Sequence, residues 1–228
     1  MAVARQSGVA RREALLDAAL RCFEQRGILR TGIEDVRKEA GASPSSVYHL
    51  FEDFPALVAA LLGRTFERLV GYVTARVLAA RTARTAVRAL VEAHLTWVFE
   101  EAEARFMYQA LALELDGHHR AALRDEKARL KAEVTAHLTE LGVFSGARSS
   151  EVVLDVLLGP AHQACRLYLS ARGAVDPAWM RATLPDLACG ALATVEPAAR
   201  AARTGKGAGA AEPAQEPGGR RKSKPSRG

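Results

Sequence analysis

The peptide TGIEDVRKEAGASPSSVYHLF, residues 31–51, contains the strongest local signals in the chain. It reads as two short helices joined by a tight turn, AGAS, at residues 40–43. Gly41 permits the positive φ that such a turn needs. Ser43 and Pro44 are the residue types preferred at the N-cap and at the first position of the following helix. The peptide therefore predicts a helix-turn-helix, a unit whose second helix enters the major groove of DNA.

Helices are also expected on both sides of this unit. Thr31 and Glu34 have the T-x-x-E spacing of a capping box and predict the start of the first short helix. A preceding helix should span residues 11–26, and a following one should run from residue 53 to about residue 80. Apolar residues at helical spacing predict a small common core. Its members are Leu15, Ala19, Cys22, Phe23, Ile33, Val36, Ala40, Ala42, Val47 and Phe51.

The spacing of these residues resembles the N-terminal domain of the TetR family of bacterial transcriptional regulators. The family segment AGxSxxxxYxxF is matched by a set of residues spread over the turn and the second helix: Ala40, Gly41, Ser43, Tyr48 and Phe51. The resemblance implies an all-α protein with a DNA-binding domain at 1–62, a helical ligand-binding and dimerisation domain at 63–196, and no enzymatic activity. The chain departs from the family at Phe54, where many members have a lysine that contacts phosphate.

The resemblance also implies which residues contact DNA. Thr31, Tyr48 and His49 would contact backbone phosphates, and Pro44, Ser45 and Ser46 would face the bases, with Ser43 beside them. Arg5, Arg11 and Arg12 would lie near phosphates or the adjacent minor groove. Each position has a structural alternative: Thr31 and His49 as helix caps, and Tyr48 as a half-buried aromatic. The second helix contains no Arg, Lys, Asn or Gln, the residues that make bidentate base contacts, so the sequence predicts no operator.

The rest of the body is also expected to be helical, at residues 83–101, 103–115, 119–141 and 150–172. The helix at 150–172 should bend at Gly159-Pro160, and a last helical stretch should begin at Asp176. The segment 197–228 holds eight Lys/Arg and two Asp/Glu, which accounts for the whole formal net charge of +6. It contains no large apolar residue and is predicted to be a disordered basic tail.

Two functions are expected of the second domain. An effector pocket is predicted from aromatic and polar residues at helical spacing, namely His94, Trp97, Phe106, Met107, Tyr108, His162, Cys165 and Tyr168, although the same pattern is typical of plain core. The effector is expected to be small and apolar or amphipathic. The resemblance places a homodimer interface on the last two long helices, and the stripe Val152, Val153, Val156, Leu157, Leu167 and Leu169 is a candidate for part of it.

Other classes of function find little support. Metal-binding and catalytic motifs such as HExxH, a Walker loop, G-x-S-x-G or paired cysteines do not occur, so no metal or other cofactor is expected. The cysteines at 22, 165 and 189 fit buried hydrophobic positions. The charged runs at 100–103 and 124–133 fit solvated helix faces. Neither a signal peptide nor a transmembrane segment is predicted, so we expect a cytoplasmic protein. The remaining alternative is an architectural DNA-binding protein that responds to no ligand.

Overall fold

The computed structural model describes residues 2–113, 117–144, 149–170 and 175–204, and every regular element among them is helical. The order is α1 (Ala2–Arg26), the short 3-10 helix η1 (Ile28–Arg30), α2 (Ile33–Glu39), α3 (Pro44–Leu50), α4 (Phe54–Val77), α5 (Ala83–Glu100), α6 (Glu103–Ala110), α7 (Gly117–Glu140), α8 (Ser150–Leu169) and α9 (Pro177–Thr204). The predicted all-α class is confirmed.

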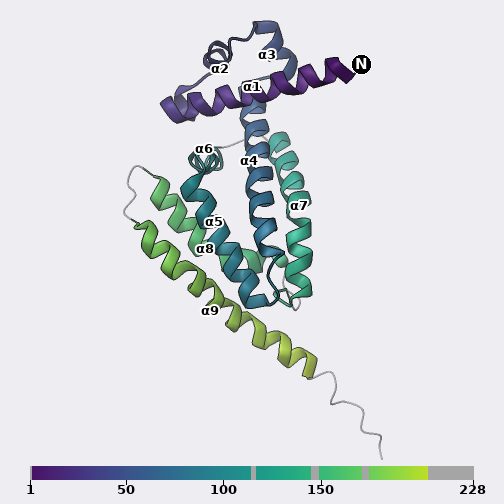
Figure 1. Ribbon diagram of the computed structural model, residues 1–228, viewed down its shortest axis with the longest axis vertical. Coiled ribbons are helices and arrows are strands. Elements are labelled where there is room, and N and C mark those ends of the chain that lie inside the picture. Colours follow the sequence, from purple (N-terminus) through teal and green to yellow (C-terminus); the bar gives the residue numbers. More distant parts are fainter. Residues whose placement is uncertain (1, 114–116, 145–148, 171–174, 205–228) are drawn as a thin grey trace, which may run out of the picture.

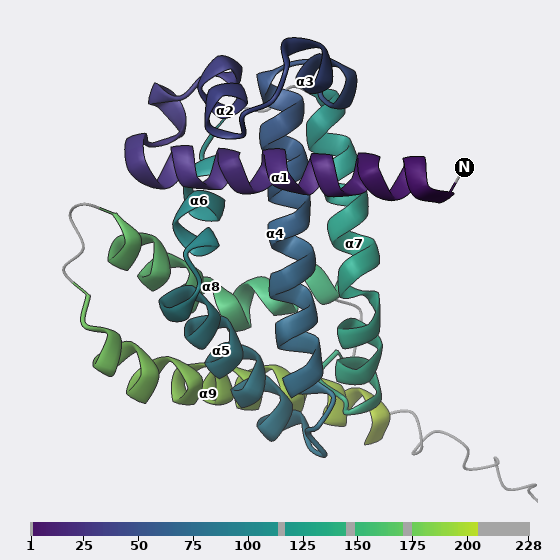
Figure 2. The ribbon, with the colours of Figure 1, turned by 45° about the horizontal axis from the view of Figure 1, so that its top comes forward.

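The helices form two groups that share α4. Figure 1 shows α1, α2 and α3 at one end of the molecule, with α4 running from beneath them into the second group, where it lies beside α7. The tilted view in Figure 2 shows α1 lying across the N-terminal half of α4. The helix α5 packs against α4 and α9, and α8 packs against α5 and α9. The expected domain boundary after residue 62 falls inside α4, so one continuous helix connects the two groups.

The core of the first group follows the sequence pattern. Leu15, Ala19, Cys22 and Phe23 of α1 are buried, together with Val36, Val47 and Phe51, while Ile33, Ala40 and Ala42 are partly buried against them. Phe23 also reaches outside this group. Its ring stacks on Phe106 of α6 at 5.4 Å between centroids and meets the edge of Phe54 of α4 at 5.9 Å. Phe54, the departure from the family pattern, therefore has a packing role.

The start of α2 differs from the prediction by one residue. Gly32, not Thr31, is the N-cap, and its N–H donates to Asp35 Oδ2 at 2.9 Å. The Thr31 hydroxyl instead donates to the Gly27 carbonyl at 2.9 Å, so it does not cap α2. Glu34 accepts from Arg37 on the surface. The predicted Thr31–Glu34 capping box is therefore wrong: α2 begins one position later, and Asp35 accepts from the backbone of its N-cap, Gly32, which has no side chain to return a bond.

Three helices differ in length from expectation. α1 begins at Ala2 rather than near residue 11, and α6 ends at Ala110. α9 continues to Thr204, so the prediction of disorder is wrong for 197–204, where alanine and arginine favour helix. Residues 205–228 lie outside the described residues. α8 runs through Gly159 and Pro160 without ending. The three cysteines are free and buried, as expected.

Candidate DNA-binding surface and effector cavity

The start of α3 is fixed by hydroxyl groups. Ser43, the N-cap, accepts a hydrogen bond from the Ser46 N–H at 3.3 Å and donates its own hydroxyl to Ser46 Oγ at 2.9 Å. The Ser45 hydroxyl lies 3.2 Å from that of Ser43. With Pro44 at the first helical position, no N–H is needed there. Three serine hydroxyls are thus gathered at the end of the helix that would approach DNA first.

One face of α3 is exposed along its whole length. Pro44, Ser45, Tyr48 and His49 are exposed and lie at positions that share a helical face, while Val47 on the opposite face is buried. Tyr48 exposes 52% of its surface, so part of its side chain is accessible to a duplex. These four residues have the placement that contact with a duplex requires.

The turn before α3 is held by two features. Gly41 adopts a φ of 61°, in the left-handed region that favours glycine. Arg37 of α2 donates from Nη1 to the Ala42 carbonyl at 3.1 Å, and its Nε–H donates to Glu34 at 2.7 Å. These contacts fix the angle at which α3 leaves α2.

The other predicted DNA-contacting residues are placed differently. Thr31 is only 7% exposed, with its hydroxyl occupied by Gly27, which favours the structural role of this residue. The Arg12 guanidinium lies 5.7 Å from the centroid of the Phe51 ring, close to the end of α3. Arg11 is exposed on α1. The side chain of Arg5 is outside the described part of the chain.

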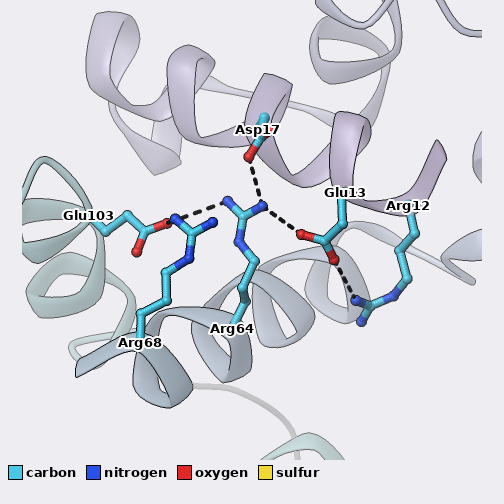
Figure 3. A network of polar contacts seen from close by, with 6 residues as sticks. All are labelled: Arg12, Glu13, Asp17, Arg64, Arg68 and Glu103. Atoms are coloured by element: carbon cyan, nitrogen blue, oxygen red, sulfur yellow. Dashed lines mark hydrogen bonds and ion pairs between the residues drawn. The ribbon is translucent and has the colours of Figure 1, made fainter. Parts of the chain in front are cut away.

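A buried charge network connects α1 with the second group of helices (Figure 3). Arg64 of α4 donates from Nη1 to Asp17 at 2.7 Å and to Glu13 at 3.0 Å, both on α1. Its Nη2 lies 3.4 Å from Glu103, the first residue of α6, which also accepts from Arg68 at 2.6 Å. The side chains of Arg64 and Glu103 are 8% and 5% exposed. Glu103 was expected on a solvated face; its burial corrects that expectation and raises the pKa of its carboxyl.

A cavity of about 430 Å³ lies within the second group, enclosed by side chains of α4, α5, α6, α7 and α8. Most of its wall is apolar. The lining residues are Phe66, Leu69, Val70, Val73, Leu90, His94, Met107, Tyr108, Leu111, Ala112, Lys127, Lys131, Val134, Leu138, Leu154, Asp155, Leu158, His162 and Arg166. A mainly apolar cavity of this size with a few polar groups is typical of small-molecule sites.

The buried polar groups of the cavity form a connected set. His94 Nε2 lies 3.1 Å from the Tyr108 hydroxyl, and the His94 and His162 rings meet edge to face at 4.7 Å. Burial, with a smaller contribution from His162, lowers the pKa of His94 to about 3. Burial also lowers the pKa of His162 and raises that of Tyr108. Both histidines are therefore neutral at pH 7 and can accept or donate a hydrogen bond without bringing charge.

Four of the eight predicted pocket residues line this cavity: His94, Met107, Tyr108 and His162. The other four do not. Trp97 is buried core, and Phe106 packs on Phe23. Tyr168 meets Phe99 at 5.0 Å. Cys165 lies behind the wall, hydrogen-bonded to Tyr108, and burial raises its pKa to about 12.

The sequence analysis missed the charged part of the wall. Lys127 and Lys131 lie in the run 124–133, which was expected to be a solvated face. The signal was present, because Lys127, Lys131, Val134 and Leu138 share one face of α7 at helical spacing. Glu126 and Arg129, on the outer side, do form the expected surface pair at 2.5 Å.

Among the residues the structure describes, none of the groups of His, Cys, Asp and Glu could hold a metal ion. No helix within the described ranges has the length and apolar character needed to cross a membrane.

Known proteins are similar to this chain both in the first group of helices and over most of its length. The family model described as bacterial regulatory proteins of the tetR family matches residues 15–61. The chain is 27% identical over 174 residues to the HTH-type transcriptional regulator BetI of Rhizobium meliloti, covering 76% of this chain and 78% of BetI. It is 26% identical over 146 residues to the HTH-type transcriptional repressor KstR2 of Rhodococcus jostii, covering 64% of this chain and 72% of KstR2.

Solved structures share the fold. The fatty acid degradation regulator FadR of Bacillus halodurans superposes with a TM-score of 0.63 at 14% identity, covering 78% of this chain and 97% of FadR. The FadR of Bacillus subtilis in complex with stearoyl-CoA superposes with a TM-score of 0.62 at 11% identity, covering 78% of this chain and 98% of that FadR. The curated relatives are named as transcriptional regulators, in agreement with the expectation that the chain is not an enzyme.

Proposed function

We propose that this chain, whose residues 15–61 match the family of bacterial regulatory proteins described as tetR, is a DNA-binding repressor that leaves its operator when a small amphipathic molecule fills the cavity of the second group of helices. The observation that carries the proposal is the exposed face of α3, presented by a fixed turn, in the same chain as a cavity that reaches α4 and α6. One relative is itself named a repressor.

The proposed DNA contacts divide by their role. Ser45, Ser46 and Pro44, at the first turn of α3, would face base edges, whereas Tyr48 and His49 would contact phosphates. Phosphate contacts set the register of the protein on the duplex, and base contacts supply the discrimination. Arg11 and Arg12 on α1 would add contacts to the backbone at the edge of this surface.

Coupling between the two sites would pass through α6 and α4. Met107, Tyr108 and Leu111 place α6 in the cavity wall, and Glu103 at its start is bonded to Arg64 and Arg68. Arg64 in turn is bonded to α1, and Phe106 stacks on Phe23. A ligand that displaces α6 would therefore act on α1 and change the spacing of recognition helices. Such a ligand shifts the equilibrium only as far as its affinities for the two conformations differ.

We also propose a homodimer formed by α8 and α9. Large apolar side chains are about half exposed on both helices, which pack against each other; they are Val152, Val156, Leu167, Trp179 and Leu187. Exposed apolar patches of this kind mark protein interfaces. Two copies would present two α3 helices to a dyad-symmetric operator, because symmetric dimers bind half-sites separated by about one helical turn or more.

The alternative of an architectural DNA-binding protein without a ligand is less well supported. It gives no reason for a cavity of about 430 Å³ lined by neutral histidines and by lysines that form no ion pair with the described residues. As a regulator of bacterial genes, the protein would act in the cytoplasm, where the chromosome lies.

Footprinting of the DNA upstream of its own gene tests the proposal. We expect a short protected region with dyad symmetry, which is lost when the matching half-site sequence is scrambled. Uniform coating of the DNA would favour the architectural alternative, and an absence of any protection at low salt would contradict DNA recognition at this site.

A further inference from the structure

The charge of the cavity wall is unbalanced. Lys127 and Lys131 of α7 and Arg166 of α8 contribute three cations, and Asp155 is the one carboxylate among the lining residues that the structure describes. Lys131, Arg166 and Asp155 are exposed, so they lie where the cavity opens to solvent. Since burial keeps the two histidines neutral, they do not alter this balance.

Lys127 is the most unusual of these groups. Its ammonium lies 4.0 Å from the centroid of the Phe66 ring, which itself forms part of the cavity wall. No carboxylate of the described residues lies within ion-pair distance of Lys127 or Lys131. The two lysines are one helical turn apart, and burial together with the charge of Lys131 lowers the pKa of Lys127 to about 8. Charges removed from water in proteins are normally paired, so an anion is missing from this arrangement.

Beyond the lysines the wall is apolar. Leu69 and Val73 of α4, Leu90 of α5 and Met107 of α6 are buried cavity residues. A molecule that fills the whole cavity would therefore meet hydrocarbon at one end and ammonium and guanidinium groups at the other.

We propose that the cavity binds an amphipathic anion, with its apolar body against α4, α5 and α6 and its carboxylate or phosphate head between Lys127, Lys131 and Arg166. This inference names the chemical class of the effector and rests on the proposed ligand-responsive function. Neutral apolar molecules would leave the lysines unpaired, and quaternary ammonium compounds would add a cation beside them. Cationic headgroups are therefore excluded by the charge of the wall.

Calorimetric titration of the purified full-length protein tests the proposal with four probes that share one alkyl tail, each kept below micelle formation. They are decanoate, decyl phosphate, decanol and decyltrimethylammonium. We expect either anion to bind about tenfold or more tightly than decanol, the gain of a hydrogen bond between charged groups, and decyltrimethylammonium to bind most weakly. The tighter of the two anions assigns the head as carboxylate or phosphate. Equal affinities for all four, or no binding by any of them, would overturn the proposal.

Lys127→Met supplies the matched variant, because methionine keeps the aliphatic contact with Phe66 and removes the charge. We expect it to weaken binding of the anion about tenfold and to change the affinity for decanol less than twofold, which also shows that the cavity remains intact. Lys38→Met, the same change on α2, is the control and should leave both affinities unchanged. If Lys127→Met weakens both probes equally, the headgroup assignment fails.

The proposed function is tested in a separate experiment, in which the anion is added to the protein bound to its operator. Release of the DNA supports both proposals. An anion that binds with the expected preference but leaves the DNA complex unchanged would sustain the chemistry inferred for the cavity and reject the proposed effector response.

Discussion

His94 shows how a single residue connects the cavity with the stability of the protein. It is buried, its Nε2 lies 3.1 Å from the Tyr108 hydroxyl, and its ring meets that of His162. A protonated imidazole here would have neither water nor a carboxylate to stabilise it, so burial lowers the pKa of His94 to about 3. The folded protein therefore requires this histidine to be neutral.

The free energy of unfolding should consequently depend on pH below about 6.5, the ordinary pKa of histidine in an unfolded chain. Between that pH and 3 the unfolded chain binds the additional proton, so stability rises with pH in this window and is lost as the solution is acidified. We expect His94→Gln, which can still hydrogen-bond to Tyr108, to reduce the loss between pH 7 and pH 5 by about 2 kcal/mol, measured by urea denaturation.

The control for His94→Gln is the same stability measurement between pH 7 and pH 8, where this histidine is mainly neutral in both the folded and the unfolded protein. The wild-type and variant curves should run parallel there. If the variant loses as much stability as the wild type between pH 7 and pH 5, the imidazole is not held neutral in the folded protein.

At the scale of elements, the network around Arg64 is what joins α1, α4 and α6. The Arg64 side chain is 8% exposed and contacts three carboxylates from two other helices. Its Nε has no hydrogen-bond partner among the described residues, so the guanidinium is held by its two terminal nitrogens. A rigid planar donor of this kind fixes helices relative to one another better than a flexible lysine would.

We expect Arg64→Met to lower the free energy of unfolding by about 2 kcal/mol, because Glu13 and Asp17 lose their shared cation and buried Glu103 keeps only Arg68 as a partner. Arg88→Met is the matched control. Arg88 joins α5 to α9 through Asp186 and also pairs with Glu92, but all three groups are exposed, so its loss should cost less than about 1 kcal/mol. Equal losses in urea denaturation would mean that burial of the Arg64 network contributes nothing.

The elements also show what the sequence could reveal. The effects of Gly41, Ser43 and Pro44 on backbone conformation and helix capping extend over only a few neighbouring residues. The turn and α3 could therefore be predicted from local sequence. The cavity could not, because its wall depends on which faces of five helices meet. Periodicity marks Trp97 and His94 alike as inward-facing, but only packing decides that one is core and the other lines the cavity. Lys127 was missed because it stands in a charged run, where only its helical spacing from Val134 and Leu138 marks the inward face of α7.

At the scale of the molecule, the proposed function requires two copies. One α3 offers a short face with three serines and one tyrosine, which is too small a surface for a specific and tight complex. The exposed apolar residues of α8 and α9 offer the surface through which a second copy would double it. Symmetry would then set the spacing of the two recognition helices, and effector binding would need to change only that spacing.

The double variant Val156→Glu/Leu187→Glu should convert the proposed dimer to a monomer, because four carboxylates would meet at the proposed interface without partners. Sedimentation velocity measures the change of oligomeric state. We expect operator affinity to fall at least about tenfold in this variant, since each protomer would bind its half-site alone. Leu29→Glu, at a residue of η1 that is 87% exposed, is the control and should remain a dimer. A variant that stays dimeric would place the interface elsewhere.

The affinity ratio between the footprinted operator and a scrambled duplex of the same length tests most directly whether α3 reads DNA. We predict that Ser45→Ala, which removes a proposed base contact in each half-site, lowers this ratio about tenfold, with the unfolding midpoint unchanged because this side chain is exposed. An unchanged ratio in a correctly folded, dimeric variant would contradict the assignment of α3 as the recognition helix.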